Sequence, residues 1–357
     1  MQDLSKKLSE RIYAMSFLSA CMIVFFHASP APEAGSFNWW FFHILGREGV
    51  CSIAVPYFFV CSGFFLAGHF GEHGWWKREV LKRVKSLMVP YYIWMAICIL
   101  FGLSVAYMKN RCFHMEVDSK FLTMGHWEQV IFYLGLHPFK DIGVLWYVRA
   151  LFLIVLASPA IFVLLRWPVC SCAVLGLAHL TVGYLFCGVL GGDMYFLFDR
   201  MVSIRGLAYF FAGAALRRAD IDLVGVVDKS KKGLFWCAGI LLLMGANLLL
   251  LRNLRGLSEI MAMLAVPFLM VGMWAIIPEW GRIRSLTQYS FPIFLMHPIF
   301  LSLISMAFMA IGLRDNVFAQ IPIAFVRTVG AVAGPILTAS LIKRRWPKLG
   351  CILFGGR

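Results

Sequence analysis

One histidine lies near the end of the first long hydrophobic run of the chain. This run begins after Arg11 and ends close to His27. Imidazole is the side chain that most readily accepts and returns a proton near neutral pH. A polar ring in a lipid-embedded segment costs free energy, so it is either functional or a hydrogen-bonding partner for a neighbouring helix. Its position alone leaves both interpretations open.

Few strongly polar residues fall inside the long hydrophobic runs. Apart from Glu259, which is at the edge of one run, they are all cationic or titratable: His27, Arg149, His179, Arg205, His297 and Arg327. Structural ion pairs need both signs of charge, so this set suits an anionic guest or a developing oxyanion. We interpret Arg205 and Glu259 as interfacial side chains that extend to water. Arg149 and Arg327 are candidates for function.

The composition is that of a membrane protein. Of the 357 residues, 61% are hydrophobic and 14% are charged, and the mean hydropathy is +0.79. A soluble domain carries roughly a quarter charged residues. We expect one membrane-embedded domain over residues 1–357 with no separate soluble catalytic domain. No cleavable signal peptide is expected, because the first run lacks an Ala-x-Ala-like exit.

The hydrophobic runs predict an all-α polytopic bundle of about ten transmembrane helices. The predicted spans are residues 12–28, 49–70, 87–107, 143–165, 168–187, 203–216, 233–251, 259–277, 288–312 and 318–342. The longest predicted outer segment, 108–142, either covers a site or simply connects two spans. Its apolar part, 130–136, is too short to cross and is predicted to be interfacial or re-entrant. This segment carries His114, His126, Trp127 and His137.

The placement of basic residues predicts the orientation of the bundle. With the N-terminus in the cytoplasm, 21 of the 33 Lys and Arg residues fall in inside segments and nine in outside loops. This asymmetry follows the positive-inside rule, so both termini are predicted to be cytoplasmic. The net charge of +15 is then mainly a matter of topology and indicates no nucleic-acid partner.

No metal site is expected. Most of the ten cysteines fall inside predicted spans, where they act as small hydrophobic residues, and there is no CxxC motif. His69 and His73 have helical spacing, but Gly68, Gly71 and Gly74 surround them. Glycines at this density favour a solvated loop over a helix.

The depth of the polar residues predicts a site nearer the outer face. His27 follows Arg11 by 16 residues, which is about 24 Å along a helix. Arg149 lies about six residues into its span, so about 9 Å deep. His297 falls near the middle of its span. These positions fit one site between helices in the outer half of the bilayer.

The inner face carries a basic amphipathic segment after the second span. Arg78, Lys82 and Lys85 recur at helical spacing, and so do Glu79, Lys82 and Arg83. Such a segment binds either lipid headgroups or a phosphorylated small molecule, and composition alone favours membrane lipid.

Five motifs follow one another along the chain, at residues 11–27, 55–66, 78–92, 145–151 and 289–298. The most specific is Val-Pro-Tyr-Phe-Phe-Val-Cys-Ser-Gly-Phe-Phe-Leu at 55–66. In content and order they resemble the membrane-bound acyltransferase 3 family, over the whole predicted bundle.

The resemblance implies an O-acyltransferase of the bacterial inner membrane. Members move an acyl group, usually acetyl, from cytoplasmic acyl-CoA to a hydroxyl of a glycan or lipid-linked sugar. Acyl-CoA is a co-substrate, and no permanently bound cofactor is implied. The resemblance makes His27 the catalytic residue and Arg78, Lys82 and Arg83 the donor contacts. Further candidates for channel or substrate contacts are Arg11, Ser16, Ser62, Trp146, Tyr147, His297 and Arg327.

One position departs from the family pattern. The family commonly has an arginine 11 residues before the histidine, and Ser16 stands there. Eleven residues make about three helical turns, so Ser16 and His27 share a face. Arg11 is about 160° away around the helix and does not replace the missing charge. Either Arg149 or Arg327 supplies that charge from another helix, or the chain is a divergent member.

These residues define a mechanistic hypothesis. The phosphates of acyl-CoA meet Arg78, Lys82 and Arg83, and the thioester reaches His27 through the bundle. Neutral His27 is the general base for an acceptor hydroxyl, and Arg149 stabilises the thioester oxyanion. A covalent acyl-histidine is not distinguished from direct transfer.

Other interpretations stay open. His297 either lines the channel or braces a helix, and Ser62 either bonds within the site or packs helices with its neighbouring glycine. A secondary transporter of anionic solutes would explain Arg149 and Arg327 equally well. A sensing or scaffold protein is favoured if Ser16 marks lost catalysis. Acceptor identity, acyl chain length and oligomeric state are not readable from the sequence.

Overall fold

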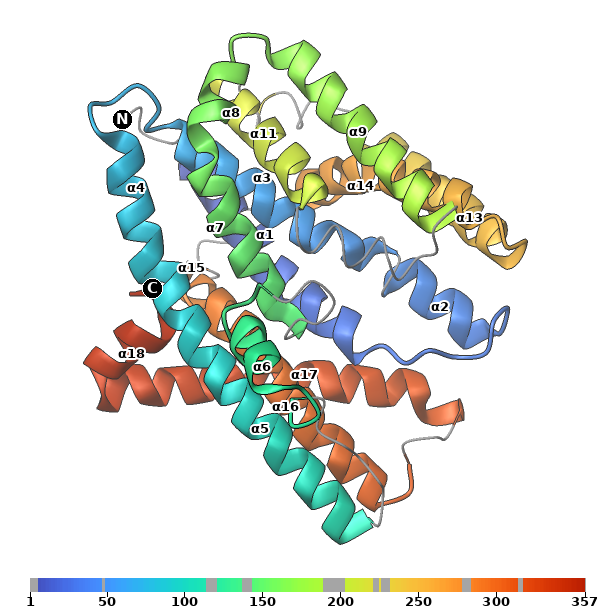
Figure 1. The fold of residues 1–357 in the computed structure, drawn as a ribbon. Coiled ribbons are helices and arrows are strands. Elements are labelled where there is room, and N and C mark those ends of the chain that lie inside the picture. The colour runs from blue at the N-terminus through green and yellow to red at the C-terminus, as the bar shows by residue number, and fades with distance from the viewer. Residues whose placement is uncertain are drawn as a thin grey trace.

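The computed structural model describes residues 6–46, 49–113, 121–136, 143–188, 203–220, 225, 232–277, 284–313 and 317–356. Their regular elements are all helical, which confirms the predicted all-α polytopic bundle (Figure 1). Of the histidines singled out in the outer segment, His114 and His137 lie outside the described residues.

The helices follow from long runs of helix-compatible apolar residues. The long ones are α1 (Lys6–Ala28), α3 (Ala54–Ala67), α5 (Val89–Phe113), α7 (Trp146–Leu156), α9 (Pro168–Gly188), α11 (Ile204–Arg218), α13 (Lys232–Leu251), α14 (Arg255–Ile276), α16 (Ser290–Ala310) and α17 (Gln320–Arg345). The shorter elements are α2 (Phe37–Leu45), η1 (Val50–Ile53), α4 (Trp75–Arg83), η2 (Val84–Met88), α6 (His126–Tyr133), η3 (Gly143–Leu145), α8 (Ser158–Leu164), α15 (Arg284–Thr287), η5 (Val317–Ala319) and α18 (Pro347–Phe354).

The count of spanning helices differs slightly from the prediction. Eight described helices are long and apolar enough to cross a membrane, or nine if the pair α7 and α8 is one span. The two helices of this pair meet at an angle of 60°, next to Pro159. Proline has no backbone N–H to donate to the preceding turn, so it interrupts the helical hydrogen bonds there. The sixth predicted span is α11, whose 15 residues cover only about 22 Å. The apolar segment 130–136, predicted to be interfacial or re-entrant, begins within the short helix α6, and its place relative to the membrane stays a prediction.

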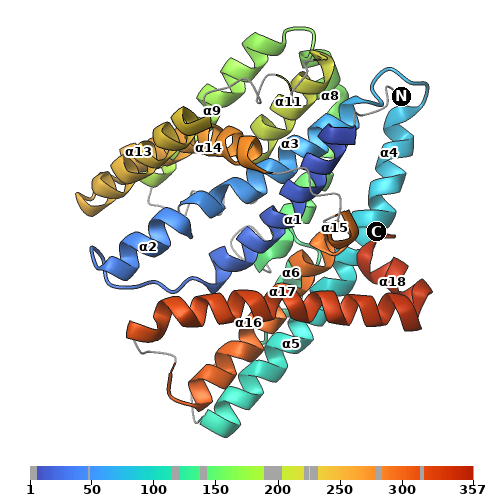
Figure 2. The same cartoon turned by 180° about the vertical axis from the view of Figure 1, so that it is seen from behind.

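Helix α1 lies at the centre and packs against α3, α16 and α17 (Figure 2). One face of α1 carries Ala20, Val24 and Ala28, which are fully buried against Ile293 of α16 and Ala331 of α17. Small side chains one turn apart let helix backbones approach closely, which is the usual packing in membranes. This face fixes the position of the end of α1, where His27 is found.

Glycines allow helices α3 and α11 to pack with their backbones in close contact. A Cβ atom on Gly63 would collide with the carbonyl of Phe210, and one on Gly213 with the carbonyl of Val60. The two backbones therefore touch directly. The neighbour of Ser62 is thus a packing residue, as one of the two interpretations of that pair predicts.

Basic segments gather at one end of the bundle. The start of α1, α4 and α18 lie on the same side of the bundle, with α18 apart from the start of α1 (Figure 1). On that side, the end of α3 places Gly68 beside Arg217 in the last turn of α11. We call this the basic end, and the opposite end, where α1 finishes, the histidine end. The grouping agrees with the charge pattern of the sequence. Which end faces the cytoplasm stays a prediction.

Replacing Gly213 by valine forces α3 and α11 apart. Overpacking of this kind costs about 1–3 kcal/mol, so Gly213→Val is expected to lower the unfolding temperature in detergent. Gly102→Val in α5 is the matched control, because that site has open space around its Cα atom. Equal unfolding temperatures for the two variants would contradict the direct backbone contact.

Candidate active site

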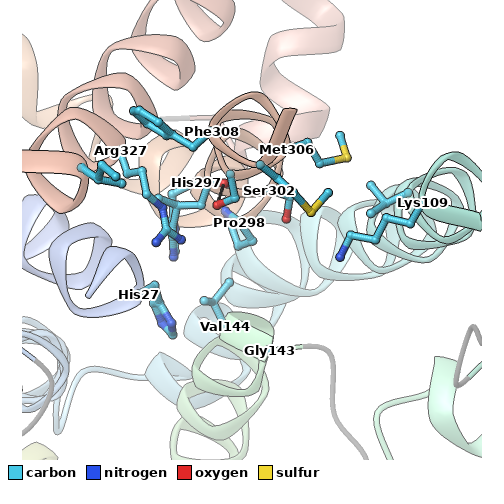
Figure 3. A pocket seen from close by; sticks show the side chains of 15 residues that line it. His27, Lys109, Gly143, Val144, His297, Pro298, Ser302, Met306, Phe308 and Arg327 are labelled. Atoms are coloured by element: carbon cyan, nitrogen blue, oxygen red, sulfur yellow. Dashed lines mark hydrogen bonds between the residues drawn. The ribbon is translucent and has the colours of Figure 1, made fainter. Parts of the chain in front are cut away.

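A pocket opens at the histidine end, between α1, α5, η3, α16 and α17 (Figure 3). Its volume is about 410 Å³. The polar residues that line it are His27, Lys109, His297, Ser302, Ser305 and Arg327. The rest of the lining is mainly aliphatic, with two methionines and Phe308. The pocket therefore joins three of the predicted site residues, His27, His297 and Arg327.

His27 and His297 both line this pocket, and their imidazole rings are neighbours. Their ring centroids are 5.2 Å apart, with 33° between the ring planes. The His27 side chain is exposed, whereas His297 is completely buried. Of the two rings, His27 is therefore the one that a molecule in the pocket can reach more easily.

Helix α16 fixes the proton arrangement of His297. Its Nδ1 lies 3.1 Å from the carbonyl oxygen of Ile293, one turn earlier. A carbonyl only accepts hydrogen bonds, so Nδ1 carries the proton and Nε2 presents a lone pair. Nε2 is buried with no hydrogen-bond partner among the described residues. It is therefore free to accept a hydrogen bond from the neighbouring imidazole or from a bound molecule.

Arg327 holds the end of α1. Its guanidinium donates from a terminal nitrogen to the carbonyl of Ala28 at 2.9 Å. Ala28 is the last residue of α1 and follows His27. The last carbonyls of a helix have no partner within the helix and carry partial negative charge, so an arginine there is favourable. Arg327 thus fixes the backbone that carries His27 while it also lines the pocket.

Arg149 is not part of the pocket lining. It is buried in α7, and its guanidinium donates to the carbonyl of Gly135. Gly135 has a φ of +71° and ends α6, where the amide of Leu136 bonds to the carbonyl of Ile131. Arg149 therefore connects the end of α6 to α7. Its role at the oxyanion stays a prediction from sequence.

Contacts between aromatic rings connect three of the sequence motifs close to His297. The ring of Tyr147 lies 4.8 Å from Phe59 and 5.6 Å from Phe294, and Phe294 lies 6.3 Å from His297. Trp146 meets Tyr147 edge-on at 6.4 Å. Residues of the motifs at 55–66, 145–151 and 289–298 thus form one cluster of aromatic rings, and this cluster contacts His297.

In the first part of α1, two side-chain hydroxyls donate hydrogen bonds to one backbone carbonyl of the helix. Ser16 donates to the carbonyl of Ile12 at 2.7 Å, and Tyr57 donates to the same carbonyl at 3.0 Å. Arg11 is buried one residue earlier. These residues and Ser62 lie outside the pocket lining. The position where the family commonly has an arginine is therefore occupied by a hydroxyl that bonds to its own helix.

The candidate donor residues surround a buried carboxylate at the basic end. Glu79 is buried, with Lys82 at 3.6 Å, Arg83 at 3.8 Å and His69 at 4.0 Å. The helical spacing of Glu79 to Lys82 and Arg83 indicates this grouping already in the sequence. The cluster keeps two of the candidate donor contacts side by side.

Arg78, the third candidate, pairs with the exposed Glu72 in the turn before α4. Desolvation acts to raise the pKa of Glu72, but hydrogen bonds from His69 and Arg78 hold that pKa below its ordinary value. His69 therefore lies in a turn between two carboxylates, as the glycine-rich sequence around it indicates.

The sequence did not predict that Arg205 and Glu259 pair with each other, and their interpretation as interfacial side chains stays a prediction. They form an ion pair at 3.0 Å between α11 and α14, and each is about a quarter exposed (27% and 26%). The carboxylate of Glu259 thus supplies a partner of opposite charge for the guanidinium of Arg205. Arg205 is therefore not a free cation of the lining.

Three polar pocket residues are missing from the sequence-based candidates: Lys109, Ser302 and Ser305. Lys109 lies two residues beyond the predicted span 87–107. A lysine at such a boundary is usually interpreted as an interfacial anchor. The two serines follow His297 by five and eight residues in one apolar helix. The available signal is that Ser302 and Ser305 are three residues apart, which makes them neighbours on the surface of α16.

The comparisons decide the family. The family model for the acyltransferase 3 group, described as an acyltransferase domain, matches residues 13–340, nearly the whole chain. The chain belongs to the acyltransferase 3 family. It is thus a multi-pass membrane acyltransferase. No curated protein and no solved structure matched the chain.

The bond from Arg327 to the end of α1 should contribute to stability in this family member. A hydrogen bond from a charged donor contributes about 1.5–3 kcal/mol, so Arg327→Ala is expected to lower stability by that order in detergent. Arg344→Ala, an exposed arginine at the end of the same helix, is the control and should stay within about 0.5 kcal/mol. A matching loss in both variants would count against the contact with Ala28.

Proposed function

We propose that this protein is an O-acetyltransferase of the bacterial inner membrane. It moves an acetyl group from cytoplasmic acetyl-CoA to a hydroxyl of a cell-surface or lipid-linked carbohydrate. The observation that carries the proposal is the exposed His27 beside the buried His297 in one pocket, in a chain of the acyltransferase 3 family.

His27 is the general base in this scheme. Its neutral imidazole takes the proton of the acceptor hydroxyl, and the oxygen attacks the thioester carbonyl carbon. The carbon–sulfur bond then breaks, and the proton passes from the imidazolium to the departing thiolate, which leaves as the thiol of CoA. A positioned base contributes about 10²–10⁴-fold to such a rate.

His297 acts through His27. Because Nδ1 of His297 is committed to the carbonyl of Ile293, its Nε2 can accept an N–H from His27. That bond would leave the lone pair of the other His27 nitrogen for the acceptor hydroxyl. The logic is that of a base oriented by a third group, so His297 is a positioning residue.

Cationic side chains near His27 could stabilise the negative charge that develops on the thioester oxygen during the reaction. Arg327 and Lys109 line the same pocket as His27, whereas Arg149 lies outside its lining. Of the two arginines that could replace the missing family charge, Arg327 therefore has the better position. A preorganised cation beside a developing oxyanion typically contributes about 10²–10³-fold.

The donor enters from the basic end. The phosphates of acetyl-CoA meet Arg78, Lys82 and Arg83, which are arranged around Glu72 and Glu79. The thioester then travels along the bundle to His27, about 24 Å beyond Arg11 on α1. An anionic-solute transporter would also use buried cations, but membership of an acyltransferase family favours the enzyme.

Loss of the imidazole should abolish transfer. With labelled acetyl-CoA on the cytoplasmic side of inner-membrane vesicles, His27→Ala is expected to lower label on glycan or lipid by at least about 10²-fold. His126→Ala, an exposed histidine of α6, is the control. Wild-type labelling by His27→Ala would remove the base from the scheme, and no labelling by the wild type with solute uptake instead would favour the transporter.

Removal of the basic cluster should affect the donor. The double variant Arg78→Ala/Arg83→Ala is expected to raise KM for acetyl-CoA about tenfold or more, because each charged contact to phosphate is lost. The control pair is Arg344→Ala/Lys348→Ala, two exposed cations at the same end of the bundle. If only the acceptor KM changed, the donor assignment would be wrong.

A further inference from the structure

We propose that the acceptor of this enzyme is an anionic amphiphile, a carbohydrate with a carboxylate or phosphate next to an apolar group. The inference deepens the proposed function, on which it rests, by naming the substrate class of the pocket. It is carried by Lys109, by the charges of the lining and by the apolar wall.

Lys109 is placed to bind an anion. It lies near the end of α5 and is half-buried, and Figure 3 shows its ammonium extending from α5 toward the pocket. It makes no hydrogen bond or ion pair with any part of the chain that the structure describes. A lysine that serves only as an anchor extends to water, whereas this one lines the pocket of the catalytic histidine.

The lining has one sign of charge. Among its described residues, Lys109 and Arg327 are cationic, His27 is titratable, and none is Asp or Glu. They come from α5, α17 and α1, so the positive potential converges on the pocket from separate helices (Figure 3). Cations in a partly apolar concavity concentrate anionic ligands.

The remaining wall is apolar and suits a hydrocarbon or an apolar aglycone. It includes Leu301, Met306, Phe308, Met309 and Ile323. Methionines in such a wall adapt to ligands of irregular shape. Ser305 already donates to the carbonyl of Leu301 at 2.6 Å, so its oxygen is left to accept a hydrogen bond from a sugar hydroxyl.

Together these features orient the acceptor. Its acidic group lies toward Lys109 and Arg327, its apolar part lies along α16, and a hydroxyl reaches His27. A neutral sugar would leave the half-buried ammonium of Lys109 without an anionic partner. The pocket therefore discriminates by charge before any chemistry takes place.

The test compares two probes that differ only in a carboxylate, octyl β-D-glucuronide and octyl β-D-glucoside. Binding to the full-length protein in a nonionic detergent is measured without acetyl-CoA, by the shift in unfolding temperature over a concentration series. The wild type is expected to bind the glucuronide at least fivefold more tightly. In Lys109→Ala the ratio is expected to fall to about one, and Lys109→Arg is expected to restore it.

Arg111→Ala is the matched control, because it removes an exposed cation two residues further along α5 and outside the lining. The control should keep the wild-type preference. Equal binding of the two probes by the wild type, or an unchanged preference in Lys109→Ala, would overturn the inference. Because no acetyl-CoA is present, failure of acetyl transfer alone would count against the proposed function and leave this binding result intact.

Discussion

The arrangement of the site depends on how the end of α1 is held. A helix end exposes carbonyl groups without partners, and here the guanidinium of Arg327 binds the carbonyl of Ala28. The alanine face of α1 packs against α16 and α17 at the same level. These two contacts fix the backbone beside His27, so an exposed ring keeps a defined position against the buried His297. Without them the ring would share the mobility of a frayed terminus.

The two ends of the bundle are chemically different. The basic end gathers the cations of α4, α11 and α17 around few carboxylates, whereas the histidine end encloses a half-apolar pocket. Helix α1 runs between them, next to the α3–α11 pair that glycines lock together. The proposed transfer across the bilayer needs such a difference between the two ends, with cations for the donor at one and a base at the other.

Much of this was predictable, and the exceptions have physical causes. Hydropathy predicted an all-α membrane bundle, and the structure has a pocket beside His27, whose function as the site stays a prediction. The ion pair of Arg205 and Glu259 was missed because the two residues are 54 positions apart and only packing brings them together. Lys109 was missed because a lysine at a span boundary has the sequence signature of an anchor. The bond from Arg149 to Gly135 depends on a loop conformation that no spacing predicts.

The central claim is that His27 is the reactive base of the pocket. Its most direct test is carbethoxylation of the intact protein with diethyl pyrocarbonate, followed by peptide mass spectrometry at each time point. The account predicts that His27 is modified much faster than the buried His297, and that acetyl transfer is lost at the same rate as His27 is modified. Full transfer activity in protein whose His27 is completely modified would contradict it.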